Sequence, residues 1–322
     1  MKNIYSNIYK PNLSNLIKAK KILENNKVIG IPTETVYGLA GNAYSNKAVK
    51  KIYKLKKRPK YNPSIVHYSN LEQLKNDCVL NKNFFILYKK FCPGPITFIL
   101  KLKKNSKISK NVTNNKKTLA IRFPKHTLVR KLLKKINYPL AAPSANISTK
   151  ISPVSKEDVI DEFGKKVKFV LDGGRSTVGL ESTIVNLIKK PQILRLGGIE
   201  ISKINRVLKT NLKFNIKKKK IVTPGQGKMH YSPGIPIRLN VKKPKLNEAF
   251  ILIQKRKSSA KNFYYLSKKK NLKEAAKKLY EILRMIKKNN FKSIAVEKIP
   301  NKGLGEAIND RLIRASKFWW KT

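Results

Sequence analysis

Hydroxyls, a carboxylate and a phenol are crowded into residues 30–41, GIPTETVYGLAG, at the end of the apolar run of residues 28–31. That run is typical of a buried strand, and in open α/β sheets ligands bind beyond the strand ends, where loops converge. Thr33 or Thr35 could instead cap a following helix, with Glu34 favoured by the helix dipole. The residues alone leave the helix cap and the binding-site mouth equally open.

Residues 56–63, KKRPKYNP, gather cations where a helix is expected to end, because the residue before Pro59 avoids the helical conformation. Lys56 and Arg58 could simply complement the negative end of that helix. The same geometry could bind a phosphate, since arginine presents a planar fork of donors and lysine a compact positive charge. In a chain this basic, the residues alone favour the helix-end interpretation.

Arg122 interrupts the apolar strand pattern of residues 118–124, TLAIRFP. A guanidinium buried in a sheet needs a carboxylate or phosphate partner. An arginine at a strand end that points into a cleft is the more economical interpretation, so we favour a ligand-binding role for Arg122.

Two loops add neutral polar groups. Residues 139–153, PLAAPSANISTKISP, combine small side chains, which let a backbone approach a ligand closely, with neutral donors and acceptors. A plain loop rich in proline, serine and asparagine is the alternative. Residues 172–183, DGGRSTVGLEST, could form a concave turn of backbone N–H groups that binds an anion. Neither loop has the spacing of a P-loop.

Several common kinds of active site are disfavoured by what the sequence lacks. Cys78 and Cys92 form no C-x-x-C pair, and the three histidines form neither H-x-x-H nor H-E-x-x-H, which argues against zinc and predicts no protein-held metal. No G-x-S-x-G elbow indicates a hydrolase triad. Few carboxylates lie in these segments, which argues against glycosidase chemistry.

The elements that must position these groups alternate between helix and strand, which predicts α/β architecture. Strands are expected over residues 27–31, 64–68, 97–102, 118–123, 168–171 and 182–187, and helices after Ser14, a candidate N-cap, and over residues 45–57 and 84–91. We predict a catalytic domain over residues 1–210, a linker over 211–236 and a small C-terminal α/β domain over 237–322.

The charge balance is extreme, with 73 Lys and Arg against 17 Asp and Glu, or +56. Such a surface attracts polyanions, nucleic acid above all. The lysines are spread along the whole chain, however, which favours compositional drift over a dedicated footprint. There is no signal-peptide pattern and no apolar run long enough for a membrane helix, so we expect a cytoplasmic protein without a membrane partner.

Taken in order, these segments resemble the YrdC-type threonylcarbamoyl-adenylate synthase family. The resemblance is carried by PTETVYGLAG, KKRPKYNPSIVH, CPGPITFIL, LAIRFPKH, PLAAPSANIS and LDGGRSTVGLESTIV, and continues through ILRLGGI, PGQGKMHYSP and GLGEAINDRLIRASK. It extends from about residue 10 to about residue 317. It implies a twisted open mixed sheet with helices and, as in the long form of the family, a smaller C-terminal Rossmann-like domain.

The resemblance also implies a reaction. L-threonine, bicarbonate or CO2, and ATP with Mg2+ would give threonylcarbamoyl-AMP and pyrophosphate, and other proteins would transfer the threonylcarbamoyl group to adenosine beside the tRNA anticodon.

Matching positions imply the site residues. Lys56 and Arg58 would be catalytic. Contacts to L-threonine are implied for Thr35, His67, Arg122, Ala142 and Ser182. Contacts to ATP are implied for Arg58, Asn62, Thr118, Ser144, Ser152, Arg195 and Tyr231. Tyr231 lies in the linker, which would fold over the nucleotide.

Two other functions compete with this one. An RNA-binding protein of the same fold without synthetase activity would suit the charge, but the aromatic stacking platforms expected of single-strand binders are not evident. A carbamoyl transferase built on a related domain would bring further domains and zinc-binding cysteines, which this sequence lacks.

Overall fold

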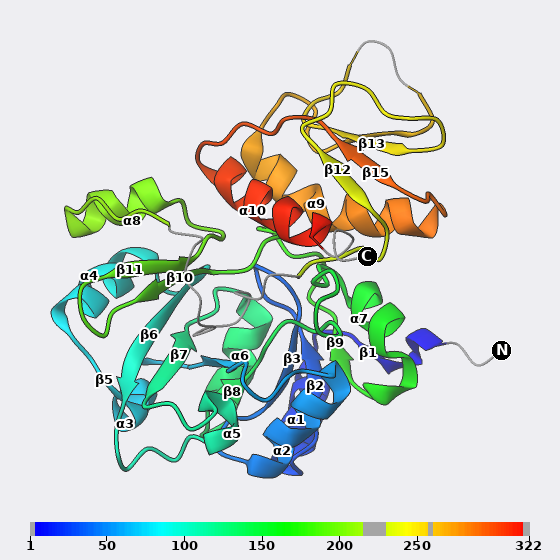
Figure 1. Ribbon diagram of the computed structural model, residues 1–322. Coiled ribbons are helices and arrows are strands. Elements are labelled where there is room, and N and C mark those ends of the chain that lie inside the picture. The colour runs from blue at the N-terminus through cyan, green and yellow to red at the C-terminus, as the bar shows by residue number, and fades with distance from the viewer. Residues whose placement is uncertain (1–3, 215–229, 257–259, 318–322) are drawn as a thin grey trace.

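An eleven-stranded mixed sheet forms the body of the protein (Figure 1). The computed structural model describes residues 4–214, 230–256 and 260–317. The strand order is β1-β9-β2-β3-β8-β4-β7-β6-β10-β11, with β5 paired to β6. The strands are β1 (Ile8–Tyr9), β2 (Ile29–Ile31), β3 (Gly38–Asn42), β4 (Ile65–His67), β5 (Cys78–Val79), β6 (Ile96–Leu102), β7 (Thr118–Arg122), β8 (Leu140–Ala141), β9 (Val170–Leu171), β10 (Thr183–Asn186) and β11 (Gln192–Arg195).

Helices connect and cover these strands. They are α1 (Leu13–Glu24), α2 (Asn46–Lys56), α3 (Leu71–Asp77), α4 (Lys82–Phe91), α5 (Lys110–Thr113), α6 (Thr127–Lys135), α7 (Lys156–Phe163) and α8 (Ile201–Leu208), with short 3-10 turns at Ile4–Asn7 and Gly164–Lys166. The cap of α1 is Asn12, whose side chain accepts from the Asn15 N–H at 2.8 Å, so the expected cap at Ser14 is wrong. Ser14 lies inside the first turn instead.

The opening segment folds as a strand, a tight polar turn and a second strand. Ile29–Ile31 pairs antiparallel with Gly38–Asn42. The Thr33 hydroxyl oxygen accepts from the backbone N–H groups of Thr35 and Val36, both at 3.2 Å. Because a strand and not a helix follows the turn, the helix-cap alternative is wrong, and these side chains lie at the mouth of a pocket.

A C-terminal unit packs above the large sheet (Figure 1). It has an all-parallel sheet in the order β12-β15-β13-β14, formed by β12 (Ile237–Leu239), β15 (Ile294–Val296), β13 (Ala249–Leu252) and β14 (Phe263–Tyr265). Its helices α9 (Leu272–Lys288) and α10 (Leu304–Ser316) lie on the side that faces the large sheet. The mixed α/β fold with a smaller second α/β unit is therefore confirmed. Most of the expected linker, residues 215–229, lies outside the described residues, and the proposed domain boundaries stay predictions.

Helix α9 rests on the loop of residues 172–183. A Cβ at Gly179 would lie 2.5 Å from the Lys277 Cα, so only glycine permits this approach, and its φ of +74° also favours glycine. Beside it, the Arg284 guanidinium donates to the Ile151 carbonyl at 2.6 Å, and Lys288 pairs with Asp161 at 2.7 Å. The second unit is thus seated directly on loops of the first.

We expect Gly179→Ala to lower stability by more than Gly174→Ala. Both positions have positive φ, which costs an alanine about 1–2 kcal/mol, but a Cβ at Gly174 would meet nothing within 4 Å. Overpacking against α9 should add about 1–3 kcal/mol at Gly179 alone. Urea denaturation of both variants measures the difference, and equal shifts in the midpoint would contradict the close packing of α9.

Candidate active site

A pocket opens where several strand ends and loops converge. It is lined by the turn after β2, the end of α2, the ends of β4 and β7, the loop after β8, the start of β10, the end of β11 and residues 230–231. The sequence-predicted residues that line it are Thr35, Arg58, His67, Arg122, Ala142, Ser144, Ser182, Arg195 and Tyr231. Segments far apart in the chain therefore meet at one site, as the predicted site residues require.

Four predicted residues lie outside the lining. Lys56, Asn62 and Ser152 each hydrogen-bond to a residue that lines the pocket. These partners are Ser144, Arg58 and Glu181, in that order. Thr118 begins β7 opposite Lys101, at the other end of the strand from Arg122. The structure does not bring Thr118 to the pocket, and its contact with ATP stays a prediction.

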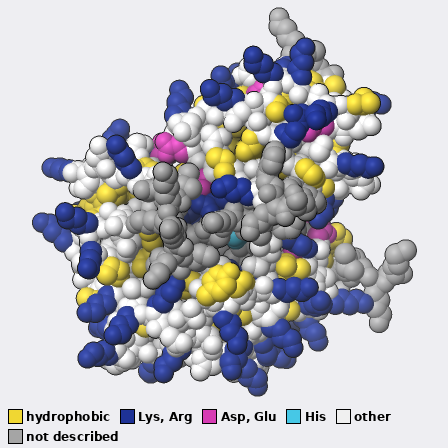
Figure 2. All heavy atoms as spheres, viewed as in Figure 1, with side chains coloured by type: hydrophobic (Ala, Val, Ile, Leu, Met, Phe, Trp, Pro, Cys, Tyr) yellow, Lys and Arg dark blue, Asp and Glu magenta, His cyan; other side chains and the backbone are white. Residues whose placement is uncertain are grey.

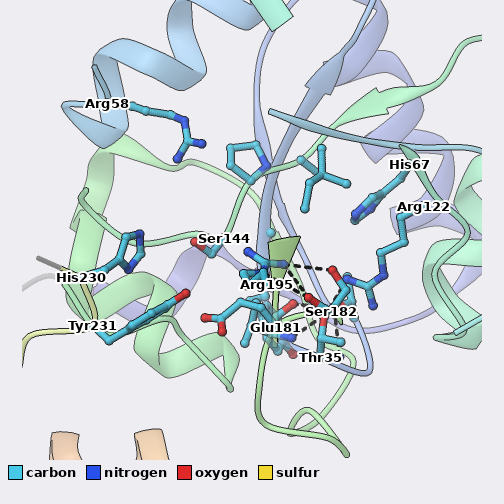
Figure 3. Close-up of a pocket in the computed structure, with 17 residues that line it drawn as sticks. Thr35, Arg58, His67, Arg122, Ser144, Glu181, Ser182, Arg195, His230 and Tyr231 are labelled. Atoms are coloured by element: carbon cyan, nitrogen blue, oxygen red, sulfur yellow. Dashed lines mark hydrogen bonds between the residues drawn. The ribbon is translucent and has the colours of Figure 1, made fainter. Parts of the chain in front are cut away.

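The pocket has two ends (Figure 3). His67, Arg122, Thr35 and Ser182 lie at one end, and Arg58, His230 and Tyr231 lie at the other. Ser144, Arg195 and Glu181 lie between them. This separation suits a ligand pair of different chemistry, one small and one larger.

Arg122 is buried and carries a carboxylate partner. Its Nη2 donates to Glu34 Oε1 at 2.6 Å, its Nη1 donates to the Thr35 hydroxyl at 2.7 Å, and its Nε donates to the Gly94 carbonyl at 3.3 Å. These contacts use three of the five N–H groups of the guanidinium. From the sequence, a partner carboxylate or a ligand could each account for an arginine at this position. The structure contains the partner and also leaves donors at the pocket.

His67 lies beside Arg122 because β4 and β7 pair in parallel with these two residues in register. Burial, together with the positive charge of Arg122, holds the pKa of His67 well below its usual value, so the ring is neutral. Its Nδ1 is buried without a hydrogen-bond partner among the described residues. A neutral ring nitrogen with no partner at the edge of a pocket can accept or donate one hydrogen bond to a ligand.

Arg58 lies just beyond the end of α2 and is held from behind. Its Nη2 donates to Asn62 Oδ1 and to the Pro63 carbonyl, both at 2.7 Å, and its Nε donates to the Asn62 carbonyl at 3.0 Å. The Arg58 guanidinium lines the pocket. Asn62 thus orients the arginine that faces the ligand.

Lys56 is 1 % exposed and holds the loop after β8. Its ammonium donates to the carbonyls of Ser144 and Asn146, the latter at 2.5 Å. Burial and the nearby charge of Arg58 lower its pKa well below the usual value. In the structure Lys56 fixes the Ser144 backbone, and any direct contact with substrate stays a prediction.

Arg195, which lies between the two ends, holds Ser182 at the first end. The Arg195 guanidinium donates to the Ser182 carbonyl at 2.9 Å and to its hydroxyl at 3.0 Å. The Ser182 hydroxyl also lies 2.7 Å from that of Thr97. Ser182 is therefore fixed by β6 and β11 at the start of β10.

Glu181 is a pocket residue that sequence reasoning did not single out. It accepts from the Ser152 hydroxyl at 2.6 Å, from the Tyr280 hydroxyl at 3.0 Å and from Arg311 Nε at 2.9 Å. Burial alone would raise its pKa, but Arg311 and Arg195 lower the pKa to about 2, so Glu181 is ionised. The sequence held one signal, a carboxylate next to the predicted threonine-pocket residue Ser182 in an otherwise basic chain.

His230 and Tyr231 close the far end. Their rings lie 4.1 Å apart, and Tyr231 takes the left-handed conformation with a φ of +66°. Burial raises the pKa of Tyr231 to about 12 and lowers that of His230 to about 3, so both are neutral. The Tyr231 hydroxyl and His230 Nδ1 are buried without partners among the described residues.

Within the described ranges, no group of three His, Cys, Asp or Glu side chains could hold a metal ion. No helix in that part of the chain is long and apolar enough to cross a membrane.

Two family models match the chain. One, described as telomere recombination and named for Sua5, YciO and YrdC, matches residues 21–197. The other, described as the threonylcarbamoyl-AMP synthase C-terminal domain, matches residues 199–317. Together they cover both units of the fold.

Similar proteins match over nearly the whole length. The threonylcarbamoyl-AMP synthase of Bacillus subtilis is 33 % identical, over 94 % of this chain and 92 % of its own. That of Pyrococcus abyssi is 34 % identical, over 93 % of both chains. The crystal structure of P. abyssi Sua5 complexed with L-threonine superposes with a TM-score of 0.87 and 30 % identity over 97 % of both chains. With its two-ended pocket and its C-terminal unit, this chain belongs to the threonylcarbamoyl-AMP synthase family.

Proposed function

We propose that the chain is an L-threonylcarbamoyladenylate synthase, a nucleotidyltransferase that makes threonylcarbamoyl-AMP and pyrophosphate from L-threonine, bicarbonate or CO2, and ATP. The observation that carries the proposal is the two-ended pocket, in which one end offers arginine and neutral polar groups and the other offers Arg58 with two aromatic side chains. The product serves threonylcarbamoyl modification of tRNA adenosine.

L-threonine is assigned to the end formed by Arg122, His67 and Thr35. Among the described residues, two of the five N–H groups of Arg122 have no hydrogen-bond partner. They can donate to a carboxylate, which forms strong charge-assisted hydrogen bonds with arginine. Neutral His67 suits a hydroxyl or amine, and Ala142 leaves room for a small side chain. P. abyssi Sua5, which binds L-threonine, has the same overall fold.

ATP is assigned to the other end. Arg58 can meet the phosphates with the guanidinium that lines the pocket. Tyr231 and His230 offer aromatic rings and polar atoms that have no partner among the described residues. Lys56 and Asn62 then act without touching the nucleotide. Lys56 fixes the Ser144 backbone, and Asn62 fixes the Arg58 side chain. Ser152 supports Glu181 between the two ends.

The chemistry follows from placing three reactants in line. The threonine amine adds to CO2 with loss of a proton and gives a carbamate. A carbamate oxygen then bonds to the α-phosphorus as the bond to the bridging oxygen breaks and pyrophosphate leaves. Positioning of this kind can supply up to about 7–11 kcal/mol, and Arg58 stabilises negative charge that develops on the phosphates.

Mg2+ would enter as the counter-ion of ATP. Glu181, which lines the pocket, and Glu34, which pairs with Arg122 behind it, are each bound to an arginine, so neither is an open metal ligand. Mg2+ bound to the phosphates would add neutralising charge there, and the protein residues described above would orient the nucleotide.

Arg58→Ala should lower turnover by about 100- to 1,000-fold, because it removes a charged donor from the developing phosphate charge. The measurement is threonine-dependent release of pyrophosphate from ATP in bicarbonate. Lys60→Ala, which removes an exposed cation two residues away, should leave turnover unchanged. Circular dichroism checks folding. Near wild-type turnover in folded Arg58→Ala would overturn the phosphate assignment.

Arg122→Gln should raise the KM for L-threonine by about 10- to 100-fold, the value of a lost charge-assisted hydrogen bond. Glu34→Gln tests the same contact from the other side, because it keeps Arg122 and removes the charge that neutralises it. If Arg122 binds the substrate carboxylate, Glu34→Gln leaves the KM for threonine unchanged or lowers it. An equal rise in both variants would mean that Arg122 serves only its pair with Glu34.

Weak electrostatic binding of tRNA is a second property that one surface favours. Lys50, Lys54, Lys57, Lys60 and Lys110 are exposed around a hollow beside α2 that no carboxylate lines. Lys50 and Lys54 are four residues apart, and like charges at this spacing destabilise a helix. Lys and Arg side chains are also scattered over the face shown in Figure 2. Only a comparison between two groups of lysines can therefore separate a role in tRNA binding from the basic composition of the chain.

A salt titration of tRNA binding makes that comparison. Replacing Lys50, Lys54, Lys57 and Lys60 by glutamine should reduce the slope of log K against log salt by about 0.9 per lost phosphate contact. The control replaces four exposed lysines elsewhere, Lys82, Lys89, Lys90 and Lys104. Equal changes in slope would mean that the lysines beside α2 contribute no more to tRNA binding than exposed lysines elsewhere.

A further inference from the structure

Glu181 places a negative charge in the wall of a pocket that otherwise presents arginines. Arg58 and Arg195 line the same pocket, and Arg122 is already neutralised by Glu34. The Glu181 side chain is only 7 % exposed, so its charge is poorly screened by water. An ionised carboxylate here would repel an anionic nucleotide or draw Arg195 away from it unless another cation neutralised it.

That cation comes from the C-terminal unit. Arg311 on α10 is 1 % exposed, and its Nε donates to Glu181 Oε2 at 2.9 Å. Its Nη2 donates to the Leu196 carbonyl at 2.7 Å, beside Arg195. Its guanidinium also lies over the Tyr231 ring, 4.8 Å from the centroid. One side chain therefore contacts two residues that line the pocket, Glu181 and Tyr231, and the backbone next to a third, Arg195.

Other contacts hold Arg311 and Glu181 in place. Asp310 accepts from Arg311 Nη1 at 2.7 Å. The Tyr280 hydroxyl of α9 lies 3.0 Å from both Glu181 oxygens, and its ring stacks on Tyr231 at 5.9 Å. Ser152 donates to Glu181 from the opposite side, at 2.6 Å. Glu181 is therefore held from both the large sheet and the C-terminal unit.

We propose that Arg311 is a positioning residue of the active site, which neutralises Glu181 and holds the Tyr231 ring, so that the pocket presents positive charge to the nucleotide. The C-terminal unit thereby supports two residues that line the pocket, Glu181 between its two ends and Tyr231 at the nucleotide end. The inference rests on the proposed function, since it takes the anionic ligand at that end to be ATP.

A purely structural role of Arg311 would give a different pattern of effects on stability and on the two substrates. Buried ion pairs contribute little net stability compared with apolar packing, whereas removing one partner leaves an uncompensated charge. If Arg311 only joined the two units, its loss would reduce stability and affect both substrates alike. If it neutralises Glu181, its loss affects ATP selectively, and removing the stranded charge restores ATP binding.

The test compares Arg311→Met, the double variant Glu181→Gln/Arg311→Met and a control, Arg238→Met. Arg238 makes a bidentate pair with buried Glu248 within the C-terminal unit and lines no part of the pocket. Steady-state pyrophosphate release gives KM and kcat for each substrate. We expect Arg311→Met to raise the KM for ATP about tenfold or more and that for threonine by less than about threefold.

The double variant should reverse most of the rise in the KM for ATP, because glutamine at position 181 can still accept from Ser152 and Tyr280 without carrying a charge. Arg238→Met should leave both KM values unchanged. Equal rises in the two KM values, or no recovery in the double variant, would overturn the proposal.

Hydrogen exchange provides a readout that does not depend on activity. Arg311→Met should increase exchange of the backbone amides in residues 172–187, and Arg238→Met should not. If the wild-type protein releases no pyrophosphate but this difference is seen, the proposed reaction fails while the positioning role stands. Unchanged exchange in Arg311→Met would overturn the positioning role itself.

Discussion

Charge buried out of water must be paired, and two arginine–glutamate pairs meet that requirement at this active site. Arg122 and Glu34 join the end of β7 to the turn after β2. Arg311 and Glu181 join α10 to the start of β10. Each pair crosses between segments far apart in the chain, so the pocket exists only when those segments are docked. The fold around the site is best understood as the framework that brings these four residues together.

The two pairs also divide the pocket into two environments. At the threonine end the arginine itself faces the pocket and its carboxylate partner lies behind, so donors remain for a substrate carboxylate. Between that end and the nucleotide end, the Glu181 carboxylate lines the pocket and Arg311 lies behind it, against the Tyr231 ring. In one pair the arginine faces the pocket, and in the other the glutamate does. The same kind of ion pair thus gives two different environments within one pocket.

Much of this site could be predicted from local sequence. Arg122 stood out because a guanidinium in an apolar strand pattern needs an explanation, and residues 139–153 stood out through their small and hydroxyl side chains. Helix α9 could be read from its apolar periodicity, since its buried residues repeat along one face. The missed helix α7 carried a signal too, because Ser155 and Asp158 form a capping box.

The other features of the site could not be predicted from local sequence, because they depend on contacts between distant segments. That a strand follows the turn at Thr33 is decided by pairing with β2, and the partner of Arg122 is fixed by the sheet order. Glu181 and Arg311 lie 130 residues apart, and no local pattern links them. The Thr118 contact with ATP stays a prediction from the family resemblance, because this residue begins β7 opposite Lys101, at the other end of the strand from Arg122.

The most direct measurement is a crystal structure of the protein with L-threonine and a non-hydrolysable ATP analogue. We expect the threonine carboxylate to bind Arg122, the nucleotide phosphates to bind Arg58, and Tyr231 to contact the nucleotide while the Arg311–Glu181 pair stays intact. Threonine bound away from Arg122, or a nucleotide that leaves Arg58 and Tyr231 untouched, would contradict it.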